Sequence, residues 1–224
     1  LEDLLSDYPT VHEEREGQVK LYKNADRGNF YIGGDVATGR SRDYSSFTLM
    51  NRQGEEYGCF KGKIDVDKFA DLLGYIGLQY NNAELAPEAN DIGMAVVSKL
   101  QTEGYPNLHF SRKLVKEKGK RKPKEEKIPG WYTTSKNRPI IIDELEEDVR
   151  NDNIIVKDPF FIQEAYTFIY DESNRPVAMG KSGKSSKGDD DMDDQIYHDD
   201  AIMGKAITNH IRKGKLNSVI VAPQ

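Results

Sequence analysis

The stretch between residues 30 and 50 limits the possible folds of this chain more than any other. An apolar run from Phe30 to Ile32 passes through two glycines to the carboxylate of Asp35, and a polar loop then leads into a second apolar run at 47–50. Short apolar runs on either side of a loop are typical of two strands. Glycines at the end of a strand let a ligand or another backbone approach closely. Asp35 is therefore the first candidate for a functional site, although a lone Asp after a strand is more often a turn residue.

The rest of the sequence predicts an α/β fold with a central mixed β-sheet flanked by helices. Residues 51–54 have the composition of a tight turn, which makes the first three strands antiparallel. Further on, apolar residues recur at helical spacing, and short apolar runs between them indicate strands. The expected elements are strands at 30–32, 46–50 and 57–62, a helix at 66–77, a strand at 84–88, a helix that ends at Gly104, a strand at 108–110, a helix at 139–150, a strand at 153–156, a helix at 158–168, a strand at 175–179 and a helix at 198–211.

The 224 residues are enough for one large domain with its own core. The first 24 residues carry mostly charge and little apolar periodicity, so we expect them to be a linker or arm that belongs to a longer chain. The domain itself is then expected over 25–213. It would contain a basic loop at 111–130, either mobile or folded as a projecting hairpin, and a flexible loop at 180–195. A C-terminal tail would follow at 214–224.

The composition excludes several classes of protein. Cys59 is the only cysteine, so neither a disulfide framework nor a thiolate zinc cluster is expected. No apolar run reaches the roughly 18 residues of a membrane span, and no signal-peptide pattern opens the chain. We therefore expect a soluble, intracellular protein. The Gly-Lys-Ser repeats at 180–188 do not form a phosphate-binding loop, because Arg175 and Ala178 stand where that loop requires glycine.

Charge is strongly segregated along the chain. The net charge is −6, yet the segment 112–127 holds nine Lys or Arg against three Glu, whereas 189–200 holds seven Asp and no Lys or Arg. This segregation allows one basic surface to meet phosphate while carboxylates elsewhere hold cations. The alternative for the basic run is a solvated loop without function, which most charge runs are.

Three acidic positions share one property, which is that each stands at the end of a predicted element. Asp35 and Glu88 end strands, and the pair Asp199 and Asp200 opens the last helix. If the two strands are neighbours and the helix packs across them, these carboxylates converge, and like charges at that range require cations between them. Oxygen ligands favour magnesium or manganese over zinc or copper. Two such ions roughly 3.5–4 Å apart stabilise the attacking and leaving oxygens of a phosphodiester displacement.

The two adjacent aspartates are not expected to play equal parts, since neighbouring helical side chains point about 100° apart. Gly204 lies one turn below Asp200 and would leave space beside a metal ion. Asp200 is therefore the favoured direct ligand, whereas Asp199 would cap the helix or bind through water.

The sequence resembles one known family in three places. The motifs are Gly34-Asp-Val-Ala-Thr-Gly-Arg-Ser-Arg-Asp43, Pro87-Glu-Ala-Asn-Asp-Ile-Gly93 and Tyr197-His-Asp-Asp-Ala-Ile-Met203. Together with a Gly-Trp-x-Thr stretch at 130–133, they are similar to motifs of the nuclease domain of the large terminase subunit of tailed bacteriophages. The resemblance extends from about Tyr31 to Ile211 and implies an RNase H/RuvC-like fold.

The resemblance also implies roles for particular residues. Asp35, Glu88 and Asp200 match the catalytic, metal-binding triad of that family. It also implies an accessory acid at Asp43 and two residues behind the ligands, Asn90 and His198. Asp199 stays a lower-ranked ligand because of its direction on the helix. From its position alone, His198 is a helix-entry residue rather than a general base, and Asp43 fits an ordinary Asx turn equally well.

DNA contacts are expected from the basic run and from two cations after it. They would bind the phosphate backbone without reading bases. The expected contact residues are Arg112, Lys113, Lys118, Lys120, Arg121, Lys122, Lys124, Lys127, Lys136 and Arg138.

The function implied by the resemblance is a Mg²⁺- or Mn²⁺-dependent endonuclease that cuts double-stranded viral DNA concatemers during genome packaging, with two ions when substrate is bound. An ATPase motor would precede it in the full-length chain, portal and small terminase would be its partners, and the isolated domain would be a monomer. It would act in the cytoplasm of the infected bacterial host. Two alternatives stay open: another RNase H-like enzyme, such as a junction resolvase or transposase core, and a non-catalytic acidic module that binds calcium or a basic protein.

Overall fold

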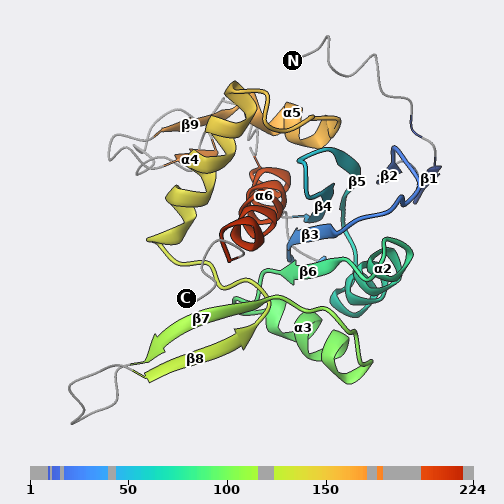
Figure 1. The fold of residues 1–224 in the computed structure, drawn as a ribbon, viewed down its shortest axis with the longest axis vertical. Coiled ribbons are helices and arrows are strands. Elements are labelled where there is room, and N and C mark those ends of the chain that lie inside the picture. Colours follow the sequence, from blue (N-terminus) through green and yellow to red (C-terminus); the bar gives the residue numbers. More distant parts are fainter. Residues whose placement is uncertain are drawn as a thin grey trace, which may run out of the picture.

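A six-stranded sheet forms the centre of the protein (Figure 1). The computed structural model describes residues 10, 12–15, 18–39, 44–115, 124–170, 176–178 and 198–218. Within these residues the strands of the sheet, in spatial order, are β1 (His12–Glu14), β2 (Val19–Leu21), β5 (Glu56–Gly62), β4 (Ser45–Asn51), β3 (Phe30–Asp35) and β6 (Glu84–Pro87).

The sheet is mixed, as the sequence predicts. Strands β3, β4 and β5 are consecutive and antiparallel, whereas β6 pairs with β3 in parallel. The expected arm at 1–24 is wrong for its second half, because β2 pairs with β5 and Val19 is fully buried. Both added strands are only three residues long and lie in a charged segment. Such strands form by pairing with an existing edge, and they leave no periodicity in the sequence.

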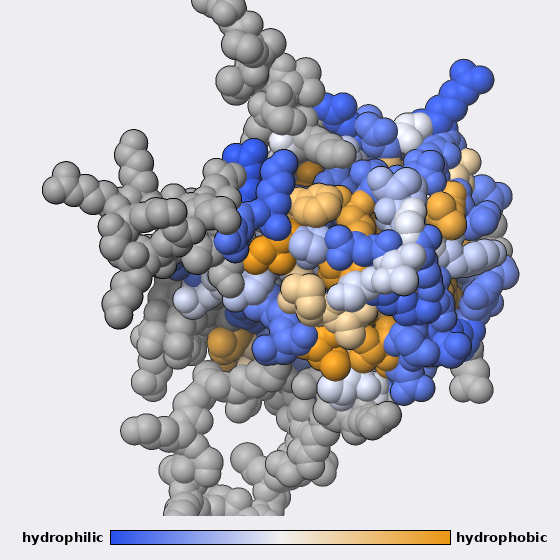
Figure 2. Space-filling model, turned by 90° about the horizontal axis from the view of Figure 1, so that it is seen from below, coloured by the Kyte–Doolittle hydropathy of each residue, from blue (hydrophilic) through white to orange (hydrophobic). Residues whose placement is uncertain are grey.

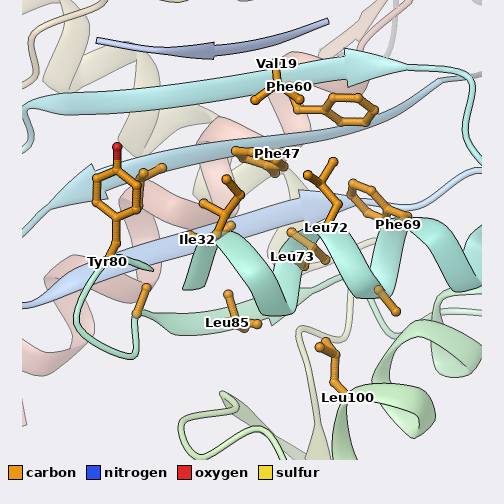
Figure 3. Packing of buried hydrophobic residues seen from close by; sticks show 14 of the residues in the cluster. Val19, Ile32, Phe47, Phe60, Phe69, Leu72, Leu73, Tyr80, Leu85 and Leu100 are labelled. Atoms are coloured by element: carbon orange, nitrogen blue, oxygen red, sulfur yellow. The ribbon is translucent and has the colours of Figure 1, made fainter. Parts of the chain in front are cut away.

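Helices cover both faces of the sheet. On one face lie α2 (Val66–Gln79) and α3 (Gly93–Thr102), and on the other lies α6 (Asp200–Ser218), with α4 (Asn137–Arg150) and α5 (Pro159–Ala165) packed outside it. Alternate residues of a strand point to opposite faces. Accordingly Ile32 packs with Phe69 and Leu73 under α2, in the core that Figure 3 shows, while Tyr31 joins Ile207 under α6.

Two small antiparallel hairpins complete the described structure. Strands β7 (Phe110–Val115) and β8 (Lys124–Pro129) form a hairpin that projects from the body of the domain (Figure 1). Of the two forms expected for the basic segment at 111–130, a mobile loop or a projecting hairpin, its described ends show the hairpin. The second hairpin joins β9 (Phe168–Tyr170) to β10 (Pro176–Ala178).

Other predicted boundaries need correction. The helix expected to reach residue 168 ends at Ala165, and the last helix starts at Asp200 and continues to Ser218, past the expected start of the tail at 214. The segment 153–156 makes only an isolated bridge, from Ile155 to Glu55. Its apolar residues Ile154 and Val156 are buried in the core beside α6, so the apolar pattern reflects packing rather than pairing. The loop expected at 180–195 lies outside the described residues.

The surface carries both hydrophobic and hydrophilic residues. On the face seen from below, hydrophobic residues gather near the centre and hydrophilic ones surround them (Figure 2), a mixture that is usual for folded chains. In the parts of the chain that the structure describes, no helix has the length and apolar character that crossing a bilayer requires.

Helix α6 lies directly against the sheet at Gly33. A Cβ atom at this position would stand 2.6 Å from the backbone N of Thr208 and 2.8 Å from the carbonyl O of Gly204. The Gly33 N–H instead donates to Thr208 Oγ1 at 2.8 Å, and this hydroxyl also lies 3.0 Å from the Thr48 carbonyl O. This contact fixes α6 across β3 and β4, and so determines where the first residue of the helix lies.

Candidate functional site

Two of the candidate carboxylates lie on neighbouring strands. Asp35 is the last residue of β3, and Glu88 directly follows β6. The parallel register pairs Gly34 with Pro87, and the Glu88 N–H donates to the Gly34 carbonyl O at 2.7 Å, so the pairing continues to Asp35 and Glu88. Asp35 also shares the sheet face of Gly33, which is covered by α6, because residues two apart on a strand point the same way.

The third carboxylate comes from the helix above them. Asp200 is the first residue of α6, and its backbone carbonyl accepts a hydrogen bond of 2.6 Å from Ser46 Oγ. Ser46 is the residue of β4 that pairs with Asp35. The beginning of α6 therefore stands over the ends of β3 and β6, which is the convergence that the sequence predicts.

The negative charges of this acidic cluster are balanced only in part by the nearby cations Lys61 and Arg138. The pKa of Asp35 lies well above its ordinary value, first because of burial, then because of the charge and hydrogen bond of Glu88, and finally because of Asp200 and Asp199. Burial also raises the pKa of Asp200 to about 7, with a further contribution from Glu164 that Lys61 opposes. Carboxylates that resist ionisation together are expected where a cation is to be bound.

The residue types fit a hard divalent cation, since every candidate ligand is a carboxylate oxygen. As the side chains stand, no three His, Cys, Asp or Glu residues within the described ranges are grouped so as to hold one ion. Asp35 and Glu88 share a hydrogen bond instead. The backbone positions of the three carboxylates thus converge, and their side chains would have to turn toward a common ion.

Asp199 is held by other groups. Its carbonyl accepts the first hydrogen bond of α6, from the Met203 N–H at 2.9 Å, and its carboxylate lies 2.5 Å from Nη2 of Arg138. It thus precedes the helix as expected. Arg138, expected at the DNA, has this carboxylate as a partner.

His198 faces the third carboxylate. Its Nδ1 lies 3.4 Å from Oδ2 of Asp200, and its ring meets the ring of Tyr44 edge to face at 5.0 Å between centroids. The Tyr44 N–H approaches the same oxygen at 3.4 Å. These long contacts leave the Asp200 carboxylate loosely held.

Two residues beside the site escaped the sequence analysis. Nζ of Lys61 lies 2.5 Å from Oε1 of Glu164 and 3.9 Å from Oδ2 of Asp200. Lys61 pairs with Ser46 in the sheet, which itself pairs with Asp35, so Glu88, Asp35, Ser46 and Lys61 form one row across four strands, called the Asp35 row below. Counting residues back from the 51–54 turn would have placed Phe60 opposite Ser46, because the register of β4 and β5 shifts by one residue between Leu49 and Met50. Nothing in the sequence indicates Glu164.

Gly204 and Asn90 have roles in packing. A Cβ at Gly204 would lie 3.0 Å from Ser46 Oγ and 3.6 Å from the Gly33 carbonyl O, so the space expected beside a metal is taken by the sheet. Asn90 accepts from the Thr133 N–H and donates to the Thr133 carbonyl O, both at 2.8 Å. It thereby ties the segment after β6 to the segment after β8.

The expected DNA contacts lie partly on the projecting hairpin. Arg112 and Lys127 pair across β7 and β8 and are exposed, and Lys136 is exposed just before α4. The backbones of Lys113 and Lys124 belong to the same two strands. The predicted site residues outside the described part of the chain are Asp43, Lys118, Lys120, Arg121 and Lys122.

Comparison with known proteins identifies the fold. No protein-family model and no curated protein sequence matches the chain. Its structure is similar to the large terminase nuclease of thermophilic phage G20c with bound magnesium, with a TM-score of 0.60 and 16% identity over 92% of this chain and 94% of that one. For the same nuclease with bound zinc, the TM-score is 0.57 and the identity is 15% over 92% of this chain and 95% of that one.

The large terminase nuclease domain of Thermus phage P74-26 gives a TM-score of 0.58 and 17% identity over 92% of this chain and 91% of that one. At such identities the likeness concerns the fold. The chain therefore has the α/β, RNase H-like fold of these nuclease domains, as its resemblance to them implied.

The raised pKa of Asp200 predicts how stability depends on pH without metal. In the unfolded chain the group ionises near 3.8, and in the folded chain near 7. The folded state therefore holds the proton longer, and its free energy of unfolding falls as pH rises from about 4 to about 7. Asp200→Asn removes this effect, and we expect it to be more stable than the parent at about pH 8, by up to about 4 kcal/mol.

Chemical denaturation in EDTA across this pH range measures the difference. The exposed Asp67 of α2 provides a control, since Asp67→Asn is expected to keep the parent's pH dependence. An Asp200→Asn variant that loses stability in parallel with the parent would contradict the assignment.

Proposed function

We propose that this chain is the nuclease domain of a large terminase subunit, and that it cuts double-stranded viral DNA concatemers during genome packaging with divalent metal ions. The observation that carries the proposal is the meeting of Asp35, Glu88 and Asp200 at one end of the sheet, in the fold of terminase nucleases. That a nuclease of this fold was solved with magnesium supports the choice of cofactor.

In the proposed mechanism Asp35, Glu88 and Asp200 would hold two Mg²⁺ or Mn²⁺ ions. When bound, such ions activate water and stabilise the attacking and leaving oxygens of a phosphodiester. Asp35 lies between Glu88 on one side and Ser46 with Asp200 on the other. It would thus be the central one of the three carboxylates. Protons held by Asp35 and Asp200 leave when a cation binds, so metal affinity rises with pH.

The other predicted residues would support this site. Asp199 binds Arg138 and would act on the ions only through water or through the start of α6. We propose that His198 restrains the Asp200 carboxylate, that Asn90 braces the segment beside Glu88, and that Asp43 adds an acid from the loop after β3.

DNA would be held by the β7–β8 hairpin and by the cations next to α4. A hairpin that projects from the domain and bears paired Arg112 and Lys127 is suited to contact phosphates along a duplex. The remaining cations of the same proposed surface are Lys113, Lys118, Lys120, Arg121, Lys122, Lys124, Lys136 and Arg138. An ATPase motor in the full-length chain, the portal and the small terminase are the proposed partners, in the cytoplasm of the infected host.

Nicking and linearisation of supercoiled plasmid test the nuclease directly. With Mg²⁺ or Mn²⁺ we expect conversion that EDTA abolishes. Asp35→Ala, Glu88→Ala and Asp200→Ala each remove a proposed ligand and should lower the rate by at least about 100-fold. Glu147→Ala, which removes an exposed carboxylate of α4, is the matched control and should cleave like the parent. Cleavage that survives the loss of Asp35 or Asp200 would mean that the chemistry lies elsewhere.

Binding to a linear duplex at several salt concentrations tests the hairpin. Each lost phosphate contact lowers the slope of log affinity against log salt by about 0.9. The double change Arg112→Glu and Lys127→Glu should therefore weaken binding and lower the slope by roughly 2. Lys68→Glu, at an exposed position of α2, makes the same kind of charge change as a control. Equal slopes for the hairpin variant and the parent would exclude the hairpin as a phosphate-binding surface.

A further inference from the structure

The ion pair of Lys61 and Glu164 lies beside the candidate metal site and is largely buried. Its side chains are 14% and 5% exposed, with 2.5 Å between Nζ and Oε1. A buried ion pair gains little net stability, because both charges lose their hydration. The effect of the ion pair on the neighbouring Asp200 carboxylate therefore matters more than its effect on stability.

Glu164 is fully engaged at the start of α6. One carboxylate oxygen accepts from Lys61, and the other accepts from the Ile202 N–H at 3.0 Å. Ile202 lies in the first turn of the helix that Asp200 opens, where a carboxylate is favoured by the helix dipole. Both oxygens of Glu164 thus already have a partner within the protein.

Lys61 is held next to Asp200 without forming a hydrogen bond to it. The 3.9 Å between Nζ and Oδ2 is too long for such a bond but short enough for a strong charge effect. The ammonium also lies 4.9 Å above the ring of Tyr44, whose backbone N–H approaches the same Oδ2. Because Lys61 belongs to the Asp35 row, its backbone is fixed by the same sheet as Asp35.

We propose that Lys61 and Glu164 are positioning residues that set the affinity of Asp200 for a divalent cation. Lys61 keeps a fixed positive charge beside the carboxylate and competes with the cation, and Glu164 keeps Lys61 in place. The proposal rests on the proposed function only in taking Asp200 as a metal ligand.

Because their charges are opposite, Lys61 and Glu164 are expected to have opposite effects on Mn²⁺ affinity. Lys61→Met removes a competing positive charge, so Mn²⁺ should bind about tenfold more tightly. Glu164→Gln removes a negative charge and retains an oxygen for the Ile202 N–H, so Mn²⁺ should bind about tenfold more weakly. The double variant removes both charges and should bind Mn²⁺ like the parent. If the pair were merely structural, all three variants would be less stable, and the Mn²⁺ affinities of the two single variants would not shift in opposite directions.

The experiment measures Mn²⁺ binding to the 224-residue chain without DNA, from the electron paramagnetic resonance signal of free Mn²⁺. Lys99→Met, which breaks an exposed ion pair on α3, makes the same charge change away from the site and should leave affinity unchanged. Thermal unfolding in EDTA establishes which variants are folded. If Lys61→Met does not fold, Glu164→Gln decides alone, because unchanged or tighter binding overturns the proposal.

Shifts in the same direction for Lys61→Met and Glu164→Gln would overturn the proposal, as would a parent chain that binds no Mn²⁺ through Asp200. The metal concentration for half-maximal plasmid nicking should follow the same order as the binding constants. Opposite shifts in a chain that never nicks DNA would remove the proposed function and leave this inference standing. A chain that nicks DNA, but whose variants bind Mn²⁺ as tightly as the parent, would support the proposed function and overturn this inference.

Discussion

The direct contact between helix α6 and strand β3 is the constraint on which the rest of the site depends. Gly33 has no side chain, so the backbone of the helix at Gly204 and Thr208 comes within a few ångströms of the strand. The Thr208 hydroxyl then joins the helix to two strands. With the helix fixed in this way, Asp200 at its start can only lie at the end of the sheet where β3 and β6 finish.

The same arrangement brings several carboxylates together, and nearby positive groups neutralise their charge only in part. The N-terminus of α6, Lys61 and Arg138 supply positive charge or dipole. Further along α6 a cation lies directly between two carboxylates, since buried Lys205 pairs with both Glu56 and Asp158. The contrast suggests that the imbalance at Asp35 and Asp200 is retained for a cation, at a cost in stability that functional sites commonly carry.

The sequence predicted those parts of the molecule that depend on local pattern. Short apolar runs indicated the central strands and helical spacing indicated α2, and the position of Asp35 and Glu88 at strand ends indicated the candidate site. Features that depend on distant pairing were missed. Strands β1 and β2 exist because β5 offers an edge. Lys61 and Glu164 meet Asp200 only through strand register and the packing of α5, and the buried residues at 153–156 looked like a strand.

The proposed function requires that Asp35, Glu88 and Asp200 hold a divalent cation in common. Anomalous diffraction from crystals of the chain soaked in Mn²⁺ tests it most directly. If the three carboxylates share a cation, a manganese peak is expected within about 2.5 Å of carboxylate oxygens from Asp35 and at least one of the other two residues. Manganese found only at other carboxylates, with none bound between β3, β6 and the start of α6, would contradict it.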